Sequence, residues 1–216
     1  MKKLTHIAAG LVLASSGLFA ATASAAEVST NIGWTSEYYY RGILQKNSSA
    51  SAGIDLTEGG FYAGAWTADV GDGLEVDGYF GYGIEMDSGL SISAGFTGYY
   101  YTGEFDDTYE EVNLNLGYGI FSLEYSIGEW QGFGNEADYD FLAVTVTGES
   151  GVYATYGTFG DEFDGDYVEV GWGTTISDID FGVAAIFSSD ELSDQFSSSG
   201  SNSESEALVF SIGMSF

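Results

Sequence analysis

The side chains best suited to chemistry in this sequence are carboxylates that recur on the polar side of alternating apolar and polar segments. Carboxylates that line one surface attract cations and repel anions, as Asp and Glu rings do in cation channels. The charged residues predicted to face a common aqueous interior are Glu37, Arg41, Asp55, Asp77, Glu85, Glu111, Glu124 and Glu169. The predicted chemistry is electrostatic selection of ions.

Arg41 is the only arginine of the chain, and it closes the stretch "STNIGWTSEYYYRG". It shares a strand face with Glu37, but four residues of strand separate the two backbones by roughly 13 Å. Two interpretations of Arg41 therefore stay open. It pairs with an inward carboxylate on its own or a neighbouring strand near the extracellular rim, or it contacts lipid phosphates where the strand leaves the membrane.

Catalysis is disfavoured by what the chain lacks. It has no cysteine, which excludes a thiol nucleophile and a disulfide scaffold. Its single histidine, His6, lies in a segment predicted to be cleaved, and hydrolases usually depend on a histidine base. We therefore predict no enzyme, no cofactor and no metal. The acidic stretch "DEFDGDYVE" fails the EF-hand spacing because Phe163 takes its third position.

Residues 1–25 have the layout of a secretory signal peptide: Lys2 and Lys3, an apolar run, and a small-residue site ending at Ala25. The apolar run is shorter than the roughly 20 residues of a spanning helix. We predict one domain over residues 26–216. It keeps two basic residues, Arg41 and Lys46, against 33 acidic ones, so nucleic acid is not an expected partner.

The rest of the chain reads as twelve alternating segments, or as ten because Phe61–Val70 and Val152–Phe159 show weak alternation. From the second segment on, tight joins alternate with longer connections. The longer connections include "RGILQKNSS", "TGEFDDTYE", "GEWQGFGNEAD", "GDEFDGD" and residues 188–206, and only "GDGLE" among them is short. This sorting predicts an all-β, transmembrane, antiparallel up-and-down barrel of about twelve strands, with short periplasmic turns and longer extracellular loops.

The apolar faces are predicted to contact outer-membrane lipid, because a soluble sandwich would not leave its opposite face so rich in Gly, Ser, Asn and Thr. Lipid offers no partners to an open sheet edge, so the last strand must pair with the first. The aromatic residues predicted to form interfacial girdles are Trp34, Tyr38, Tyr40, Tyr82, Tyr100, Tyr118 and Trp172. The apolar C-terminal residues Phe210, Ile212, Met214 and Phe216 resemble the signal that the barrel assembly machinery reads.

The stretch "STNIGWTSEYYYRGILQ" resembles the N-terminal signature of the TorF-type porin family of Gram-negative bacteria. The matching positions are Ser29, Asn31, Thr35, Ser36, Tyr38, Arg41, Gly42 and Gln45, and "GGFYAGAW" from Gly59 to Trp66 is a second match. The chain departs from the family pattern at Leu44, where the family carries serine, and lacks a Pro-Ala after the first strand. The resemblance implies an outer-membrane barrel with pore activity.

We therefore expect passive diffusion of small ions or solutes, with a preference for cations. The alternative is a nonconducting structural or adhesive barrel, since twelve strands lie between the filled eight-stranded barrels and the open ones of sixteen or more. Inward tyrosines at positions 39, 79, 101 and 167 would narrow the interior. The low-complexity segment 188–206 is expected to be a solvated loop, with a lid over the pore as the alternative.

Overall fold

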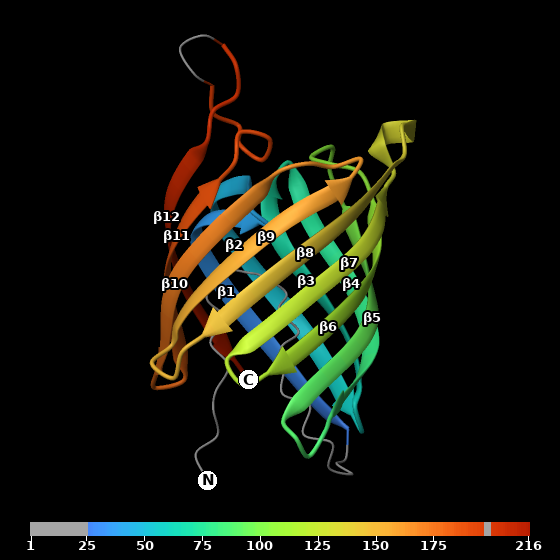
Figure 1. Cartoon of the computed structure of the whole chain (residues 1–216), viewed down its shortest axis with the longest axis vertical. Helices are drawn as coiled ribbons and strands as arrows, with labels where there is room; N and C mark the ends of the chain where they lie inside the picture. Colours follow the sequence, from blue (N-terminus) through green and yellow to red (C-terminus); the bar gives the residue numbers. More distant parts are fainter. Residues whose placement is uncertain (1–25, 197–199) are drawn as a thin grey trace.

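The computed structural model describes residues 26–196 and 200–216, and the predicted signal peptide lies outside this part. Twelve antiparallel strands form one closed barrel in which each strand pairs with its neighbours in sequence and β12 pairs with β1 (Figure 1). The strands are β1 (Glu27–Tyr40), β2 (Ile43–Glu58), β3 (Phe61–Gly71), β4 (Gly73–Glu85), β5 (Leu90–Tyr101), β6 (Tyr109–Tyr118), β7 (Phe121–Trp130), β8 (Ala137–Thr147), β9 (Val152–Asp161), β10 (Asp166–Ile176), β11 (Ile179–Ser188) and β12 (Ser205–Ser215). The predicted barrel of about twelve strands is confirmed.

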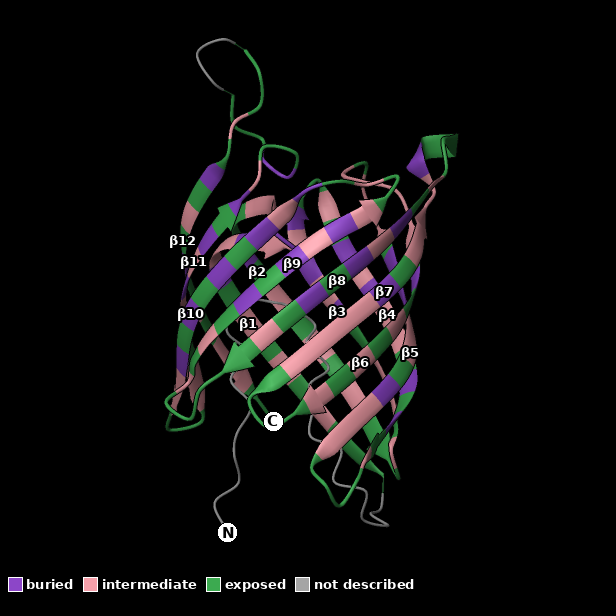
Figure 2. Cartoon of the chain, viewed as in Figure 1, coloured by how far each residue is buried: buried purple, intermediate pink, exposed green. Residues whose placement is uncertain are grey.

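Alternation along each strand separates an outer from an inner face, because successive side chains of a strand point to opposite sides. On β6, Val112, Leu114 and Leu116 are exposed, while Glu111, of the opposite parity, is buried. Buried and exposed residues also alternate along β8 and β10 (Figure 2). The weakly alternating segments Phe61–Val70 and Val152–Phe159 are strands too, as β3 and β9.

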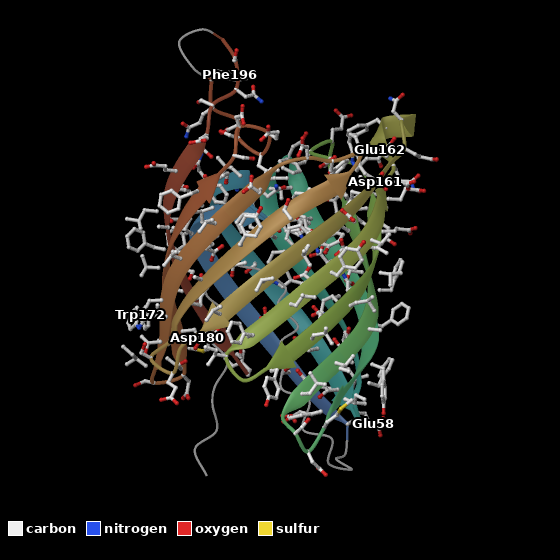
Figure 3. All side chains as sticks on the ribbon, in the orientation of Figure 1. Glu58, Asp161, Glu162, Trp172, Asp180 and Phe196 are labelled. Atoms are coloured by element: carbon white, nitrogen blue, oxygen red, sulfur yellow. The ribbon has the colours of Figure 1, made fainter. Side chains whose placement is uncertain are left out.

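The outer surface is dominated by exposed Val, Ile, Leu, Phe, Tyr and Trp side chains. Figure 3 shows large side chains projecting outward from the wall, Trp172 among them. An apolar surface this extensive fits a hydrocarbon environment. In residues 26–196 and 200–216, no helix has the length and apolar content to cross a bilayer.

The two ends of the barrel differ in their connections. Both described termini and the tight joins, such as Gly59–Gly60 and Gly119–Ile120, lie at one end (Figure 1). The opposite end carries the connection between β11 and β12 and that between β7 and β8, which contains the 3-10 turn η1 (Gly132–Gly134). This is the loop sorting that the sequence predicts.

One predicted loop is wrong. "RGILQKNSS" is not a long connection, because β2 begins at Ile43 and only Arg41 and Gly42 separate it from β1. Both turn residues have positive φ, 48° and 83°, as the tightest hairpin turns require. The pairing of β1 with β2 shifts register between Tyr38 and Tyr39, so the alternation of β2 is interrupted near its start. For this reason the sequence pattern does not indicate the first residues of β2.

Candidate functional site in the barrel interior

The end of the β1–β2 hairpin leaves the barrel wall. Pairing of β1 with β12 stops at Thr35, and pairing of β2 with β3 begins only at Ser51. Pairing of β1 with β2, by contrast, continues out to Tyr40 and Ile43. Residues 36–50 are therefore a two-stranded ribbon paired mainly with itself, which we call the hairpin tip.

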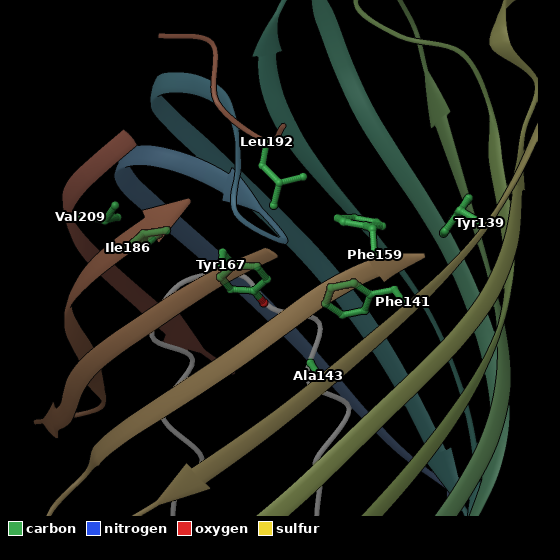
Figure 4. Packing of buried hydrophobic residues seen from close by; sticks show 8 residues of the cluster. All are labelled: Tyr139, Phe141, Ala143, Phe159, Tyr167, Ile186, Leu192 and Val209. Atoms are coloured by element: carbon green, nitrogen blue, oxygen red, sulfur yellow. The ribbon is translucent and has the colours of Figure 1, made fainter. Parts of the chain in front are cut away.

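The hairpin tip lies inside the barrel. Tyr39 and Ile43 pack against a buried cluster that includes Phe141, Phe159 and Tyr167, and in Figure 4 the blue hairpin bends in from the wall toward these rings. The Ser188 hydroxyl on β11 donates to the Gly42 carbonyl oxygen at 2.6 Å. The tip is thus seated against the inner face of β8 to β11.

Arg41, at the apex of the tip, binds the opposite wall. Its Nη1 and Nη2 donate to the two carboxylate oxygens of Glu111 on β6 at 2.8 and 2.9 Å. Nη2 also donates to Glu124 at 2.7 Å and to Ser126 at 3.2 Å, both on β7. Since β6 and β7 are remote from β1 and β2 in the strand order, the guanidinium bridges the interior.

The Arg41 guanidinium is enclosed by rings as well as carboxylates. Its carbon lies 4.1 Å from the centroid of the Phe141 ring and 5.0 Å from that of Tyr40, a cation–π geometry. Glu111 is fixed in turn by donors from Tyr99, Asn113 and Tyr139. A paired, fully coordinated guanidinium is the form in which a permanently charged group can be buried.

These contacts correct two expectations. Arg41 is 7% exposed and does not contact a lipid-facing surface, and its partners lie across the barrel and not on its own or a neighbouring strand. Tyr38 is buried and Tyr40 stacks edge-on against Tyr99, so neither belongs to a lipid-facing girdle. The inward bend of the tip removes these two rings from the lipid-facing surface. The other predicted girdle residues are exposed: Trp34, Tyr82, Tyr100, Tyr118 and Trp172.

The remaining predicted charges are spread over the inner wall. Asp55 accepts a hydrogen bond from Tyr79 at 2.5 Å, and buried Glu169 accepts one from Tyr153. Asp77 is buried on β4, and Glu85 is half-buried at the end of the same strand. Glu37 is half-buried beside a cavity of about 20 Å³, room for about one water.

The structure brings Arg41, Glu111 and Glu124 together, and it does not pair Arg41 with Glu37.

Sequence reasoning missed Glu75, which is buried on β4 and accepts a hydrogen bond from Tyr38 at 2.8 Å. The pattern places Glu75 in the connection "GDGLE", whereas β4 begins at Gly73, and the spacing of two from Asp77 puts both carboxylates on one strand face. In the described ranges, no group of three or more His, Cys, Asp or Glu residues could hold a metal ion.

A closed antiparallel strand order, an apolar exterior and a charged interior define a transmembrane β-barrel. The chain belongs to the family described as "Bacterial protein of unknown function (Gcw_chp)", whose model matches residues 19–215. A search of curated proteins found no match.

One solved structure shares the fold, and two others show weaker similarity. One, described as "Unveiling the Mechanism Behind the in-meso Crystallization of Membrane Proteins", is 7% identical, with 88% of this chain and 83% of that chain covered and a TM-score of 0.58. OprD of Pseudomonas aeruginosa is 10% identical, with 88% and 66% covered and a TM-score of 0.43. OccK2 (OpdF) of the same organism, in complex with glucuronate, is 13% identical, with 85% and 61% covered and a TM-score of 0.42. The chain spans less than two thirds of the length of these two Pseudomonas proteins.

Proposed function

We propose that this protein is an outer-membrane porin-like barrel through which small cations diffuse passively. The observation that carries the proposal is the charge of the inner wall. Glu75, Asp77, Glu111 and Glu169 are buried there, whereas Arg41 is the one buried base of the described residues. A negative interior with low-dielectric walls concentrates cations and excludes anions.

Outer-membrane placement is part of the same proposal. It is supported by the signal-peptide pattern of residues 1–25, by the resemblance to TorF-type porins and by the apolar outer face. On β12, Phe210 and Ile212 are exposed, as is Phe216 after its end, and Met214 is half-buried on the same strand face. We assign these residues to recognition by the barrel assembly machinery. No catalytic role is proposed, because residues 26–216 contain neither histidine nor cysteine.

Planar-bilayer recording of the purified protein under a KCl gradient tests this function. Discrete current steps with a reversal potential of the sign expected for cation flow support it. The double variant Asp55→Asn, Glu169→Gln removes two inner charges outside the Arg41 cluster and should reduce the cation preference. Glu58→Gln, at an exposed turn, is the control and should leave it unchanged. Absence of current steps, or a preference for anions, would refute the proposal.

A second candidate function is a nonconducting structural barrel. The observation that favours it is the hairpin tip, which together with the aromatic cluster around Phe141 and Tyr139 occupies the interior. This candidate predicts that cells lacking the protein keep their solute permeability but change in surface properties. Vesicle-swelling assays on outer membranes with and without the protein separate the two functions.

A further inference from the structure

Strand β4 carries two buried carboxylates, Glu75 and Asp77, on its inner face. Their spacing of two residues places both side chains on the same side of the strand. The two residues are 1% and 0% exposed. Three of their four cross-strand partners are aromatic: Tyr101 lies opposite Glu75, and Tyr99 and Trp66 lie opposite Asp77, whereas Ala68 is the other partner of Glu75.

Most of the oxygens of this pair have no donor. Glu75 Oε1 accepts a hydrogen bond from the Tyr38 hydroxyl at 2.8 Å. Glu75 Oε2 and both oxygens of Asp77 are buried and have no hydrogen-bond partner in the described part of the chain. Burying an ionised carboxylate without a partner is among the most unfavourable arrangements in a protein. These oxygens therefore require either protons or a positive partner.

The chain does not supply that partner. The basic residues among those that the structure describes are Arg41 and Lys46. Arg41 donates its hydrogen bonds to Glu111, Glu124 and Ser126. Lys46 pairs with Asp69 near the end of β3. The neutralising charge at Glu75 and Asp77 must then come from outside the chain.

We infer that Glu75 and Asp77 form a binding site for one divalent metal cation inside the barrel. Two carboxylates match a charge of +2, and carboxylate oxygens are the ligands that Mg²⁺ and Ca²⁺ prefer. Because no third acidic, histidine or cysteine side chain joins the pair in the described residues, the cation keeps part of its water shell, as protein-bound Mg²⁺ commonly does. Tyr38, on the hairpin tip, covers one side, with its ring edge-on to Trp66 at 5.8 Å.

This site is separable from the proposed function, because a barrel that does not conduct can still bind a cation. The test is calorimetric titration of Mg²⁺ and of Ca²⁺ into the metal-stripped, detergent-solubilised barrel at pH 8, in a constant sodium background. The expected result is saturable binding of one ion and a rise in the melting temperature with added cation. Asp77→Asn should weaken binding at least tenfold. Glu58→Gln is the control, because that carboxylate lies at the exposed end of β2, outside the interior, and its loss should leave the affinity unchanged.

Glu75→Gln provides a second variant should Asp77→Asn fail to fold, which heat-modifiable migration on gels reveals. Saturable binding that survives both substitutions would overturn the site. So would a native protein that binds neither ion and is stabilised only by lowering the pH, since the pair would then be neutralised by protons.

Discussion

At the scale of single residues, Arg41 is the central observation. It adopts a left-handed backbone conformation, φ 48°, that non-glycine residues seldom take. Such a conformation persists where surrounding contacts hold it, and here these are the hydrogen bonds to Glu111 and Glu124 and the Phe141 ring. One side chain thus couples the hairpin tip to the opposite wall.

Replacing Arg41 by alanine should be strongly destabilising, because Glu111 would stay buried without its counter-charge. We expect the free energy of unfolding to fall by about 3 kcal/mol, the usual cost of removing one member of a buried ion pair. Urea titration of the refolded barrel, followed by tryptophan fluorescence, measures it. Lys46→Ala is the control, since Lys46 and its partner Asp69 are 25% and 42% exposed and solvent-accessible pairs contribute only about 0–1 kcal/mol. Equal losses in both variants would contradict this account of Arg41.

At the scale of elements, the hairpin tip decides whether the interior is filled. It is held at Arg41, at the Ser188 bond to Gly42 and by packing of Tyr39 and Ile43. None of these contacts belongs to the strand ladder of the wall. The tip can therefore be released without opening the barrel.

The variant Gly42→Ala tests this. A Cβ added at Gly42 would lie 2.7 Å from Tyr167 Cβ, and Gly42 has a φ of +83°, which side chains disfavour. The hairpin tip therefore cannot stay in its native position against β10. We expect a larger single-channel conductance than in the native protein if the tip obstructs a pore. Gly59→Ala is the matched control: its φ is +56°, but an added Cβ meets nothing within 4 Å. A conductance rise in both variants would trace the effect to backbone strain, and no current in either would favour the structural barrel.

At the scale of the whole molecule, the interior carries an excess of negative charge inside an apolar shell. The proposed selectivity is therefore electrostatic, and dissolved salt should weaken it. The screening length falls from about 10 Å at 0.1 M salt to about 3 Å at 1 M. We expect the cation preference, measured from reversal potentials, to decline over this range. A preference independent of salt would indicate selection by direct contact with the ions.

Barrel closure makes a separate prediction for electrophoresis. Every strand is paired on both sides, although the β1–β12 ladder is short: it runs from Asn31 to Thr35 and is extended by two backbone hydrogen bonds between Thr30 and Phe216. A closed hydrogen-bonded sheet resists detergent, so unheated protein should migrate differently from heated protein. The same band, recovered and tested for conductance, connects closure with function. Identical migration with and without heating would contradict a stable closed barrel.

Outside the hairpin tip, the sequence by itself determined the strands, their outer faces and the closure. The strands and their faces follow from alternation and connection length, which are local properties: Val112 and Leu114 share one strand face, and in lipid that apolar face turns outward. Closure then follows from the need to pair every edge in lipid.

Only the tertiary structure decided the interior. Arg41 meets Glu111 and Glu124, which lie 70 and 83 residues away, because the curvature of the wall and the inward bend of the hairpin tip bring them together. The same bend buries Tyr38 and Tyr40, whose spacing along the strand matches that of lipid-facing residues. The alternation of apolar and polar residues does not show that the hairpin tip leaves the sheet. The contacts of Arg41, Tyr38 and Tyr40 therefore follow only from the folded barrel.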